Sequence, residues 1–430
     1  MATSTQLRKQ IEAGQWDERL SVLYGSEPEM LEHQRARYCA ALEQFELYYG
    51  PNRQVRVYSA PGRTELGGNH TDHQHGYGLA AAVTLDLVAV ASPSDDGFIR
   101  VKSRGFNKLD VIDLGEASPQ DGESTHSASL VRGIAEGFRA AGKTIGGFDA
   151  YTTSDVLRGS GLSSSAAFEM GMAVILNDEF DCGFSAPELA KICQYAENTF
   201  FGKPSGLLDQ LTSAVGGVLF ADFADPKEPL MEKIHAEGLL PAGMTLCVTD
   251  TRGSHSELTG EFAAIRNEME EVARCFGKKV MGEVEEEAFW KELPRVRQAC
   301  GDRAALRGIH YFTENTRALA QKEALQTGNF SEFLRLIREN GHSSFEYCQN
   351  VYCSIDPRHQ GLSIALAISQ TILSGSRGAW RMQGGGFAGT IQAFVPEERL
   401  TRYCDAIEAV FGMGSCYKLR LREQGAERVI

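Results

Sequence analysis

The chain has 430 residues, of which 42% are hydrophobic and 23% charged, and its formal net charge is −14 at pH 7. These proportions are typical of a globular protein with enough chain for two or three domains. The acidic balance argues against an extended nucleic-acid-binding surface, which normally carries a basic patch or stripe.

No membrane segment or secretory signal is predicted. The first residues lack the apolar stretch of a signal peptide, and no run approaches the roughly 18 apolar residues that a membrane span needs. The ten cysteines form no CxxC pair, and the closest two are Cys348 and Cys353. We therefore expect a cytoplasmic protein whose cysteines are reduced, buried and free of a disulfide framework.

The N-terminal part of the chain changes from helical to strand-like patterns. Residues 1–50 mix charged and apolar residues at helical spacing, whereas "RQVRVYSAPGR" (53–63) alternates and ends at a Pro-Gly turn signal. Residues 78–94 predict a buried strand with 99–104 as a neighbour. A helix is then expected over 129–142, and a further strand over 147–156.

The remaining elements are mixed helices and strands without regular alternation. Ser185 and Glu188 form a capping-box pattern at the start of one helix. The other expected elements are a short helix and strand within 202–223, a strand at 244–251, helices at 257–277 and 302–341, and a glycine-rich loop with a strand at 374–396. This order indicates an α+β fold in two lobes.

The segment "GSGLSSSAAF" (159–168) places a glycine-serine loop before an apolar helix that begins near Ser164. The first N–H groups of a helix lack internal partners and, with the helix dipole, favour an anion such as phosphate. Gly159 and Gly161 allow close approach of the backbone, and Ser163 to Ser165 offer hydroxyls. No lysine follows, so this is not a Walker A loop. A serine-capped helix remains the alternative.

Two further segments could serve a polyphosphate ligand. The loop "RMQGGGFAGT" (381–390) is either a second phosphate loop or a tight turn between strands. In 195–211, Glu197 and Asp209 flank a glycine-containing loop, and Asp209 lies among apolar residues in "GLLDQL". Such a carboxylate must be paired, have a raised pKa, or take part in function; a helix cap or a buried ion pair remains the alternative.

The segment "GRTELGGNHTDHQHG" (62–76) is rich in polar side chains and glycine. His70, Asp72, His73 and His75 could be zinc ligands, but no pair at i, i+4 and no distant Cys/His set supports this. Two interpretations remain. Arg63 faces a phosphate or carboxylate while His70 and Asp72 bind ligand hydroxyls, or the segment is only a turn between strands.

Taken together, these blocks resemble the galactokinase branch of the GHMP small-molecule kinases. That branch has blocks similar to GR-x-N-L-I-G-E-H-x-D-Y, GxGLSSSA, GxxCGxMDQ and RMTGxGFGG. The corresponding segments in this chain are "GRTELGGNHTDH", "GSGLSSSA", "GKPSGLLDQ" and "RMQGGGFAG", in the same order. The resemblance extends from about residue 55 to the C-terminus, and the first fifty residues are longer than the usual extension.

The resemblance implies a two-lobed GHMP kinase fold with the active site between the lobes. The expected divisions are an N-terminal helical extension (1–50), an N-terminal lobe with the sugar site and ATP phosphate loop (51–220), and a C-terminal lobe (221–430). The implied reaction is ATP-dependent phosphorylation of the anomeric hydroxyl of galactose, with ATP and Mg²⁺. The expected partners are a small sugar and ATP, with no nucleic acid and no membrane.

The resemblance also assigns roles by position. Asp209 is the catalytic carboxylate at the sugar O1, and Arg63 stabilises charge between it and the γ-phosphate. Ser165 and Glu197 hold Mg²⁺. The implied ATP-binding residues are Gly159, Ser160, Gly161, Leu162, Ser163, Ser164 and Ser165. The implied sugar-binding residues are Asn69, His70, Asp72, Gly206 and Phe262.

Four positions depart from the family pattern. Asn69 replaces the glutamate that faces the sugar 6-hydroxyl, and Glu65 replaces an asparagine. His73 and Phe262 replace tyrosines. Because neutral asparagine tolerates a 6-carboxylate, a kinase of galacturonate or arabinose is an alternative. A non-catalytic sugar and ATP sensor is a second alternative, although the serine loop that such relatives lose is intact in this chain; mevalonate- and homoserine-type kinases lack the H-x-D block.

Overall fold

The computed structural model describes residues 2–430 except for Ala117, Asp121, 157–160, Pro204, Glu237, 254–257 and Ser354. The helices are α1 (Ser4–Glu12), α2 (Asp17–Tyr24), α3 (Pro28–Tyr49), α4 (Ser127–Ala140), α5 (Ser164–Glu179), α6 (Ala186–Ala196), α7 (Leu208–Val215), α8 (Thr259–Arg274), α9 (Glu286–Lys291), α10 (Leu293–Gln326), α11 (Phe330–Ser343), α12 (Gly361–Leu373) and α13 (Glu397–Phe411). Short helical turns are η1 (Asp72–Gln74), η2 (Glu197–Phe201), η3 (Met281–Glu283) and η4 (Ser344–Cys348).

The strands form two separate sheets. Their bounds are β1 (Arg56–Gly67), β2 (Tyr77–Ser94), β3 (Phe98–Ser103), β4 (Asp110–Asp113), β5 (Gly147–Ser154), β6 (Val218–Asp222), β7 (Leu230–Ile234), β8 (Met244–Asp250), β9 (Ala379–Met382), β10 (Thr390–Pro396), β11 (Cys416–Leu419) and β12 (Glu427–Arg428). The first sheet has the order β12-β1-β2-β5-β3-β4, with β6 joined to β2 and β7. The second has the order β11-β8-β10-β9.

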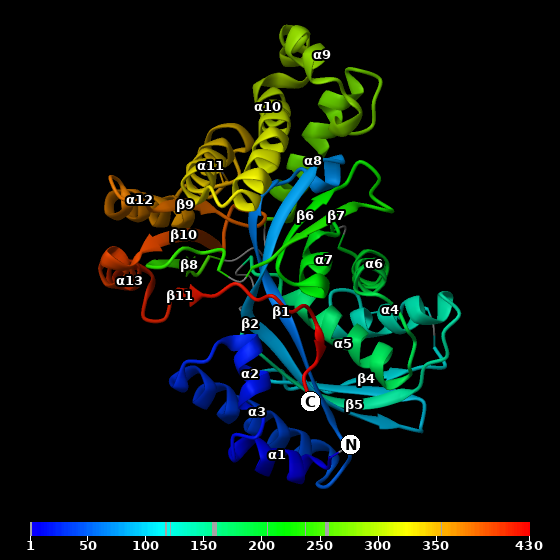
Figure 1. The fold of residues 1–430 in the computed structure, drawn as a ribbon. Coiled ribbons are helices and arrows are strands. Elements are labelled where there is room, and N and C mark those ends of the chain that lie inside the picture. Colours follow the sequence, from blue (N-terminus) through cyan, green and yellow to red (C-terminus); the bar gives the residue numbers. More distant parts are fainter. Residues whose placement is uncertain are drawn as a thin grey trace.

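Helices cover both faces of the first sheet (Figure 1). On one face α5 and α7 pack on β1 and β2, with α4 and α6 beside them. On the other face α3 packs on β2 and β5, and α1 and α2 pack on α3. Buried apolar side chains fill both layers, so the expected N-terminal helices are confirmed and their position covers the sheet.

A buried ion cluster joins the N-terminal helices to the sheet. Asp86 of β2 is fully buried, and Arg37 of α3 lies 2.6 Å from it. Arg422 contacts the same carboxylate at 3.1 Å, and Tyr24 of α2 donates a hydrogen bond to it at 2.6 Å. Burial alone would raise the pKa of Asp86, but Arg37 and Arg422 hold the pKa below its usual value. The extension is therefore an integral layer of this lobe.

Strand β1 differs from the sequence expectation. The Pro61-Gly62 pair predicts an end to the strand, but β1 continues to Gly67. The ladder to β2 shifts register between Pro61 and Arg63, which is where the missing N–H of proline is accommodated by an irregularity. Because the strand continues, Arg63 lies on β1 and faces the region where the loops converge.

One other expectation about the sheets is corrected. The sequence predicts the segment 99–104 beside 78–94, but β3 pairs in parallel with β5 and antiparallel with β4. A parallel pair needs a crossover connection, and the chain makes it through α4. This crossover places β5 between β2 and β3. The last residues also leave the second sheet, since β12 pairs with Tyr58 and Ser59 of β1. The division at residue 220 therefore remains a proposed lobe boundary, with β7 and β12 on the first sheet.

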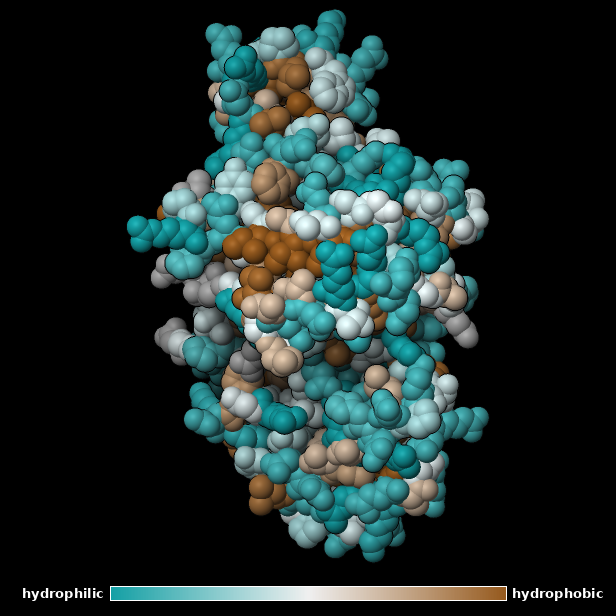
Figure 2. All heavy atoms as spheres, turned by 90° about the vertical axis from the view of Figure 1, so that its left-hand side faces the viewer, coloured by the Kyte–Doolittle hydropathy of each residue, from teal (hydrophilic) through white to brown (hydrophobic). Residues whose placement is uncertain are grey.

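The second sheet carries α11, α12 and α13, while α8 and α10 pack together beside it and α9 extends away (Figure 1). Figure 2 looks onto the side on which α12 and α13 lie and shows hydrophobic side chains gathered in a band. On α12, Leu362 is buried whereas Ile364 is half exposed. Within the described part of the chain, no helix has the length and apolar character to cross a membrane.

Candidate active site

Arg63 and Asp209 come together from different elements. Arg63 lies on β1, and Asp209 lies in the first turn of α7. The Nε and Nη2 atoms of Arg63 each lie 2.7 Å from Oδ1 of Asp209. Ser163 donates a hydrogen bond to Oδ2 of the same carboxylate, and Nη1 of Arg63 donates to the Gly161 carbonyl. The two predicted catalytic residues are therefore in direct contact beside the serine loop.

The Asp209 carboxylate is both accessible and ionised. Its side chain is 35% exposed, whereas the Arg63 side chain is only 7% exposed. Burial of Asp209 would raise its pKa, but Arg63 and then the Ser163 hydroxyl lower it by more, so the pKa lies below its usual value. Asp209 is thus a negatively charged acceptor at neutral pH that a ligand can reach.

The serine loop leads into α5, which begins at Ser164 as the sequence predicts. Ser163 has a left-handed backbone with φ of 57°, and Gly161 has φ of 68°. The Gly161 backbone also contacts the second glycine-rich loop, since a Cβ on Gly384 would lie 3.3 Å from the Gly161 Cα. Two of the predicted ATP-binding residues, Gly159 and Ser160, lie outside the described residues.

Ser165 and Glu197 also meet, with Oγ of Ser165 3.3 Å from Oε1 of Glu197. Hydroxyl and carboxylate oxygens are the ligands that Mg²⁺ prefers. The sequence did not indicate that Lys203 lies 2.8 Å from the same Oε1 atom. Ser205 and Gln210 donate to the other oxygen, at 2.5 and 2.9 Å. The carboxylate is therefore held by an ammonium and by neutral donors.

A second carboxyl group lies close to Glu197. Nε2 of Gln210 donates to Glu169 at 3.0 Å and to Glu197 at 2.9 Å, so it bridges the two side chains. Glu169 is fully buried, and burial followed by the nearby Glu197 charge raises its pKa well above the usual value. The folded protein therefore favours the protonated form of Glu169, and its Oε1 has no hydrogen-bond partner among the described residues.

The loop between β1 and β2 carries the histidines and Asp72. Nε2 of His70 lies 2.9 Å from the Gly385 carbonyl, and Nδ1 lies 3.4 Å from Nε2 of His73. Burial lowers the pKa of both rings, so both are neutral. These contacts use the ring nitrogens as hydrogen-bonding groups within the protein, and the described residues show no zinc-type cluster in this loop.

Asp72 and Gly206 are in direct contact. A Cβ on Gly206 would lie 1.8 Å from Oδ2 of Asp72, so a side chain at this position would displace the carboxylate. Burial raises the pKa of Asp72 to about 6, although the His73 N–H donates to its Oδ1 at 2.8 Å. The structure thus brings together two of the predicted sugar-binding residues, just before α7.

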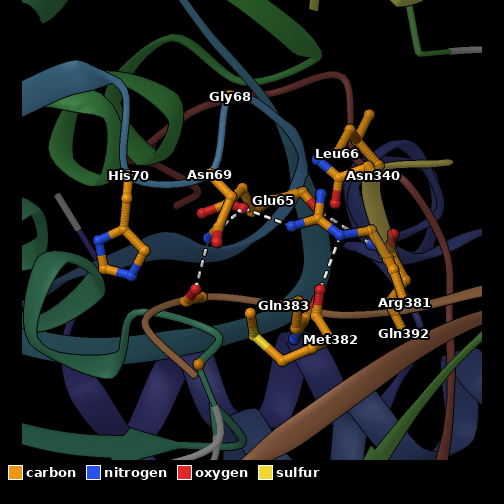
Figure 3. Close-up of polar contacts among 12 residues, drawn as sticks. Glu65, Leu66, Gly68, Asn69, His70, Asn340, Arg381, Met382, Gln383 and Gln392 are labelled. Carbon is orange, nitrogen blue, oxygen red and sulfur yellow. Dashed lines mark hydrogen bonds and ion pairs between the residues drawn. The ribbon is translucent and has the colours of Figure 1, made fainter. Parts of the chain in front are cut away.

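Asn69 is almost fully buried beside Glu65 (Figure 3), and both ends of its amide contact protein groups. Its Nδ2 donates to Oε1 of Glu65 at 2.9 Å and to the Gly384 carbonyl at 2.7 Å. Its Oδ1 accepts from Nδ2 of Asn350 at 2.9 Å. A contact between Asn69 and a sugar would therefore have to replace or share one of these bonds.

Glu65, the neighbour of Asn69 in this network, forms a buried ion pair. Nη2 of Arg381 lies 2.6 Å from Oε1 of Glu65, and the Arg381 side chain is fully buried (Figure 3). Two of the four departures from the family pattern are therefore in contact with each other. Phe262, another of the predicted sugar-binding residues, packs edge-on against Phe387 with ring centroids 5.4 Å apart.

Sequence reasoning missed the residues that hold this loop from the second lobe. Four polar side chains of α10 form hydrogen bonds to the backbone of this loop and the adjoining strands. Nε2 of His310 lies 2.9 Å from the Asn69 carbonyl, and Glu314 accepts from the Gly68 N–H at 2.9 Å. Asn315 accepts from the Tyr77 N–H at 2.8 Å, and Gln321 donates to the Leu66 carbonyl at 3.0 Å. Positions 310, 314 and 321 share one helix face. Polar residues at that spacing, in a helix that must bury one side, could have indicated from the sequence that this face forms hydrogen bonds to another element.

Known proteins that are similar to this chain in sequence show its family. The model of the GHMP kinases N terminal domain matches residues 129–217, and the galactokinase galactose-binding signature matches residues 43–93. The galactokinase of Streptomyces coelicolor is 30% identical over 394 residues, which cover 90% of this chain and 97% of that protein. The chain belongs to the galactokinase family. A galactokinase of Glaesserella parasuis is 30% identical over 358 residues, or 83% of this chain and 89% of that protein.

Solved structures show the same fold. The galactokinase of Lactococcus lactis, complexed with galactose, superposes with a TM-score of 0.77 at 24% identity and covers 90% of this chain and 98% of its own. The mevalonate kinase of Methanococcus jannaschii gives a TM-score of 0.60 at 16% identity, with 86% of this chain and 99% of its own covered. The expected two-lobed α+β GHMP kinase fold is confirmed, and an active site between the lobes stays a prediction.

Proposed function

We propose that this galactokinase-family protein transfers the γ-phosphoryl group of ATP to the anomeric hydroxyl of galactose, giving galactose 1-phosphate and ADP. The observation that carries the proposal is the contact of Arg63 with Asp209 beside the Ser163 hydroxyl. The cluster lies where the two glycine-rich loops meet, in a chain that matches a galactose-binding signature. Phosphoryl transfer depends mainly on such positioning and on charge neutralisation.

Asp209 binds and orients the anomeric hydroxyl. Its low pKa makes it a good hydrogen-bond acceptor but a weak base, so it aligns the hydroxyl oxygen with the γ-phosphorus. The proton leaves the hydroxyl as the new P–O bond forms, and the carboxylate receives it at that stage. Oδ2, which Ser163 contacts, is the oxygen that the sugar hydroxyl approaches.

Arg63 and the start of α5 counter the charge of the phosphates. Arg63 spans from Asp209 to the Gly161 carbonyl, so its guanidinium lies between the carboxylate and the phosphate loop. The N–H groups of the first turn of α5, which begins at Ser164, supply donors that need no rearrangement. Together these groups hold the nucleotide and stabilise the charge that develops on the transferred group.

Ser165 and Glu197 would hold Mg²⁺, because their oxygens lie close together and match the ligands that this ion uses. When bound, the ion neutralises charge on the β- and γ-phosphate oxygens. Lys203 provides a second positive charge at the same carboxylate. Burial alone would lower the pKa of Lys203, but Glu197 raises it by more, so the side chain stays protonated.

The sugar is recognised by hydrogen bonds from the loop between β1 and β2. Asp72 offers acceptors to the hydroxyls, His70 would exchange one of its two protein contacts for a hydroxyl, and Gly206 leaves the space that the Asp72 carboxylate occupies. Phe262 lies against Gly385, whose carbonyl contacts His70. A site that pairs each hydroxyl discriminates against epimers, since a mismatch leaves buried polar groups without partners.

A kinase of galacturonate or arabinose is the second candidate, favoured by Asn69 and Phe262 at positions where the family has glutamate and tyrosine. The Glu65–Asn69 contact argues against a galacturonate or arabinose kinase. The pair still contains one carboxylate and one amide, 2.9 Å apart, with their positions exchanged relative to the family pattern. A carboxylate is therefore retained beside the amide, where Arg381 pairs with it, and galactose is the proposed substrate.

The test is an ADP-release assay with Mg-ATP and, side by side, galactose, galacturonate, arabinose, glucose and N-acetylgalactosamine. We expect the highest kcat/KM with galactose and no turnover by Asp209→Asn. A preference for galacturonate or arabinose would replace the substrate but leave the kinase assignment. Binding of sugar and ATP without turnover by the unmodified protein would support a sensor.

A further inference from the structure

Three cysteines from separate elements of the second lobe converge. They are Cys247 of β8, Cys404 of α13 and Cys416 of β11. Their sulfur atoms all lie within 4.8 Å of one another, and the Cys404 and Cys416 sulfurs are 3.4 Å apart. Within the described ranges, this is the one cluster of three or more His, Cys, Asp or Glu side chains with metal-ligand spacing.

The fold explains the convergence. In the antiparallel pair of β8 and β11, Cys416 lies opposite Thr249 and Cys247 lies opposite Lys418. Side chains two residues apart share a face, so Cys247 and Cys416 are diagonal neighbours on the same side of the sheet. Helix α13 packs on that side and adds Cys404 (Figure 1). Each cysteine is placed by regular structure, with no flexible loop involved.

The spacing fits a metal ion held by three sulfurs. With Zn–S bonds of about 2.3 Å, tetrahedral coordination places pairs of sulfur atoms about 3.8 Å apart. The Cys404 and Cys416 sulfurs, 3.4 Å apart, lie close to this value, and all three sulfurs lie within 4.8 Å of one another. A disulfide would use only two of the three sulfurs and would require a contact of about 2.05 Å.

The surroundings also suit a metal site. Cys247 is fully buried, whereas Cys404 and Cys416 are partly exposed, so two of the three residues are within reach of solvent. Zinc commonly combines three protein ligands with one water molecule. Thiolates are the soft ligands that select zinc over Mg²⁺, so this cluster differs in chemistry from the oxygen ligands of Ser165 and Glu197.

We propose that Cys247, Cys404 and Cys416 form a binding site for one Zn²⁺ ion, with water as the fourth ligand. On binding, the three thiols lose their protons to solvent and the ion joins the three thiolates, with no change of oxidation state. The ion ties α13 to β8 and β11, so the site stabilises the second lobe. It lies on elements other than those that carry Arg63 and Asp209, and the proposal does not depend on the sugar substrate.

The chain contains its own matched control. Cys275 and Cys300 form another close pair, with sulfur atoms 3.3 Å apart and partly exposed side chains. This pair has only two sulfurs, and no third Cys, His, Asp or Glu among the described residues completes a cluster there. A serine at Cys275 therefore removes a thiol of similar exposure without touching the proposed site.

The experiment uses the full chain, reduced and stripped of metal with a chelator, in excess Mg²⁺ to occupy oxygen-ligand sites. Zn²⁺ is titrated against a chromophoric competing chelator, and Cd²⁺ is titrated separately to record thiolate-to-metal charge-transfer absorption. The variants are Cys404→Ser, Cys416→Ser and, as control, Cys275→Ser. Because Cys404 and Cys416 are partly exposed, their serine variants are expected to fold, which circular dichroism checks.

We expect one tightly bound Zn²⁺ per chain, a rise in Tm on zinc addition, and a Cd²⁺ signal from thiolates. Cys404→Ser and Cys416→Ser should each weaken zinc binding by about 100-fold or more and abolish the rise in Tm, because each removes one of three ligands. Cys275→Ser should behave as the unmodified chain. The proposal is wrong if the reduced chain takes up no zinc, if folded Cys404→Ser binds as tightly as the unmodified chain, or if only a Cys404–Cys416 disulfide is found.

Discussion

Arg63 contacts Asp209 through two nitrogens that share one carboxylate oxygen, with Nε and Nη2 each 2.7 Å from Oδ1. Among the described residues, the hydrogen-bond partner of Oδ2 is the neutral Ser163 hydroxyl. Arg63 holds Oδ1 in place, and the Ser163 hydroxyl contacts Oδ2. These two contacts define where an incoming sugar hydroxyl can bind. The carboxylate is thereby fixed in direction before any substrate arrives.

Asp209→Asn should lower kcat by about 10³-fold or more, because asparagine cannot supply the charge that orients the hydroxyl and balances Arg63. Steady-state kinetics with galactose and Mg-ATP measures the effect. Since the pKa of Asp209 lies below its usual value, its protonation should cause no loss of rate between pH 5 and 8 in the unmodified enzyme.

Ser163→Ala is the matched control for this variant. The sugar hydroxyl replaces the Ser163 hydroxyl at Oδ2, so we expect a loss of about tenfold or less in kcat/KM. An equal loss in the two variants would contradict the assignment of Asp209 as the orienting group.

The Glu65–Asn69 pair should behave as a compensated exchange. Glu65→Asn leaves the buried Arg381 without its carboxylate, and Asn69→Glu places two carboxylates together. Each single variant should lose about 3 kcal/mol of unfolding free energy. The double variant restores one carboxylate and one amide, so it should recover about 2 kcal/mol or more of the summed loss.

Denaturant unfolding of the four proteins gives this coupling energy, and sugar kinetics of the double variant give its functional effect. Losses that simply add would show that the two positions act independently. A double variant that regains stability and still prefers galactose over galacturonate would show that either order of the pair serves the same substrate.

Asp72 should make sugar binding and stability depend on pH in opposite senses. Its folded pKa of about 6 lies above its usual value near 3.8, so the folded state binds more protons than the unfolded state between these values. Stability from this group is therefore greatest at low pH and falls as pH rises through 6. The carboxylate form, which accepts hydrogen bonds from sugar hydroxyls, predominates only above pH 6.

The variant Asp72→Asn removes this pH-dependent cost. It should be more stable than the unmodified chain by about 3 kcal/mol at pH 7.5 and equal to it near pH 4. Its KM for galactose should rise while its KM for ATP is unchanged. Thermal unfolding over a pH series measures the first effect, and a stability gap that is constant with pH would rule out titration of the Asp72 carboxyl group as its cause.

Local motifs allowed much of the site to be predicted. The serine loop, the start of α5 at Ser164 and the capping box of Ser185 with Glu188 depend on neighbouring residues, and the structure has all three. The meeting of Arg63 and Asp209 required the family resemblance, because the two positions are 146 residues apart. Short-range patterns carry no information about such pairs.

Other features depend on contacts between distant elements, so the sequence could not indicate them. The pairing of β3 with β5 follows from the crossover through α4, and the bond from Glu314 to Gly68 crosses 246 residues. The ten cysteines have no regular spacing, yet three of them meet because a helix packs over two adjacent strands. Lys203 at Glu197 was missed because its residue type departs from the metal-ligand pattern.

Lys203 should compete with Mg²⁺ for the Glu197 carboxylate. Lys203→Met removes the ammonium that lies 2.8 Å from Oε1, so half-maximal rate should require about three- to tenfold less free Mg²⁺. Lys203→Arg keeps the charge and should change the requirement little. Initial rates over a series of free Mg²⁺ at fixed ATP give the comparison, and a higher requirement in Lys203→Met would show that the lysine supports the nucleotide instead.

Glu169 should tolerate, and even favour, a neutral isostere. Its folded pKa is raised well above the usual 4.5, so between pH 4.5 and that folded pKa the folded chain retains a proton that the unfolded chain has lost. This difference costs stability above pH 4.5, and the cost grows with pH until the folded pKa is reached. Glu169→Gln keeps the shape and the acceptor for Gln210 without the titration, so it should be more stable by about 1 kcal/mol or more at pH 8 and equal near pH 4.5.

Two comparisons complete the test of Glu169. Glu169→Ala leaves a cavity and a Gln210 amide without its acceptor, so it should lose about 2 kcal/mol or more at every pH. Glu197→Gln removes the carboxylate that Lys203 contacts and should raise the Mg²⁺ requirement, whereas Glu169→Gln should leave it unchanged. If Glu169→Gln also raises the Mg²⁺ requirement, Glu169 is ionised in the working enzyme and binds the ion together with Glu197. The reason is that the replacement weakens Mg²⁺ binding only where it removes a charged carboxylate.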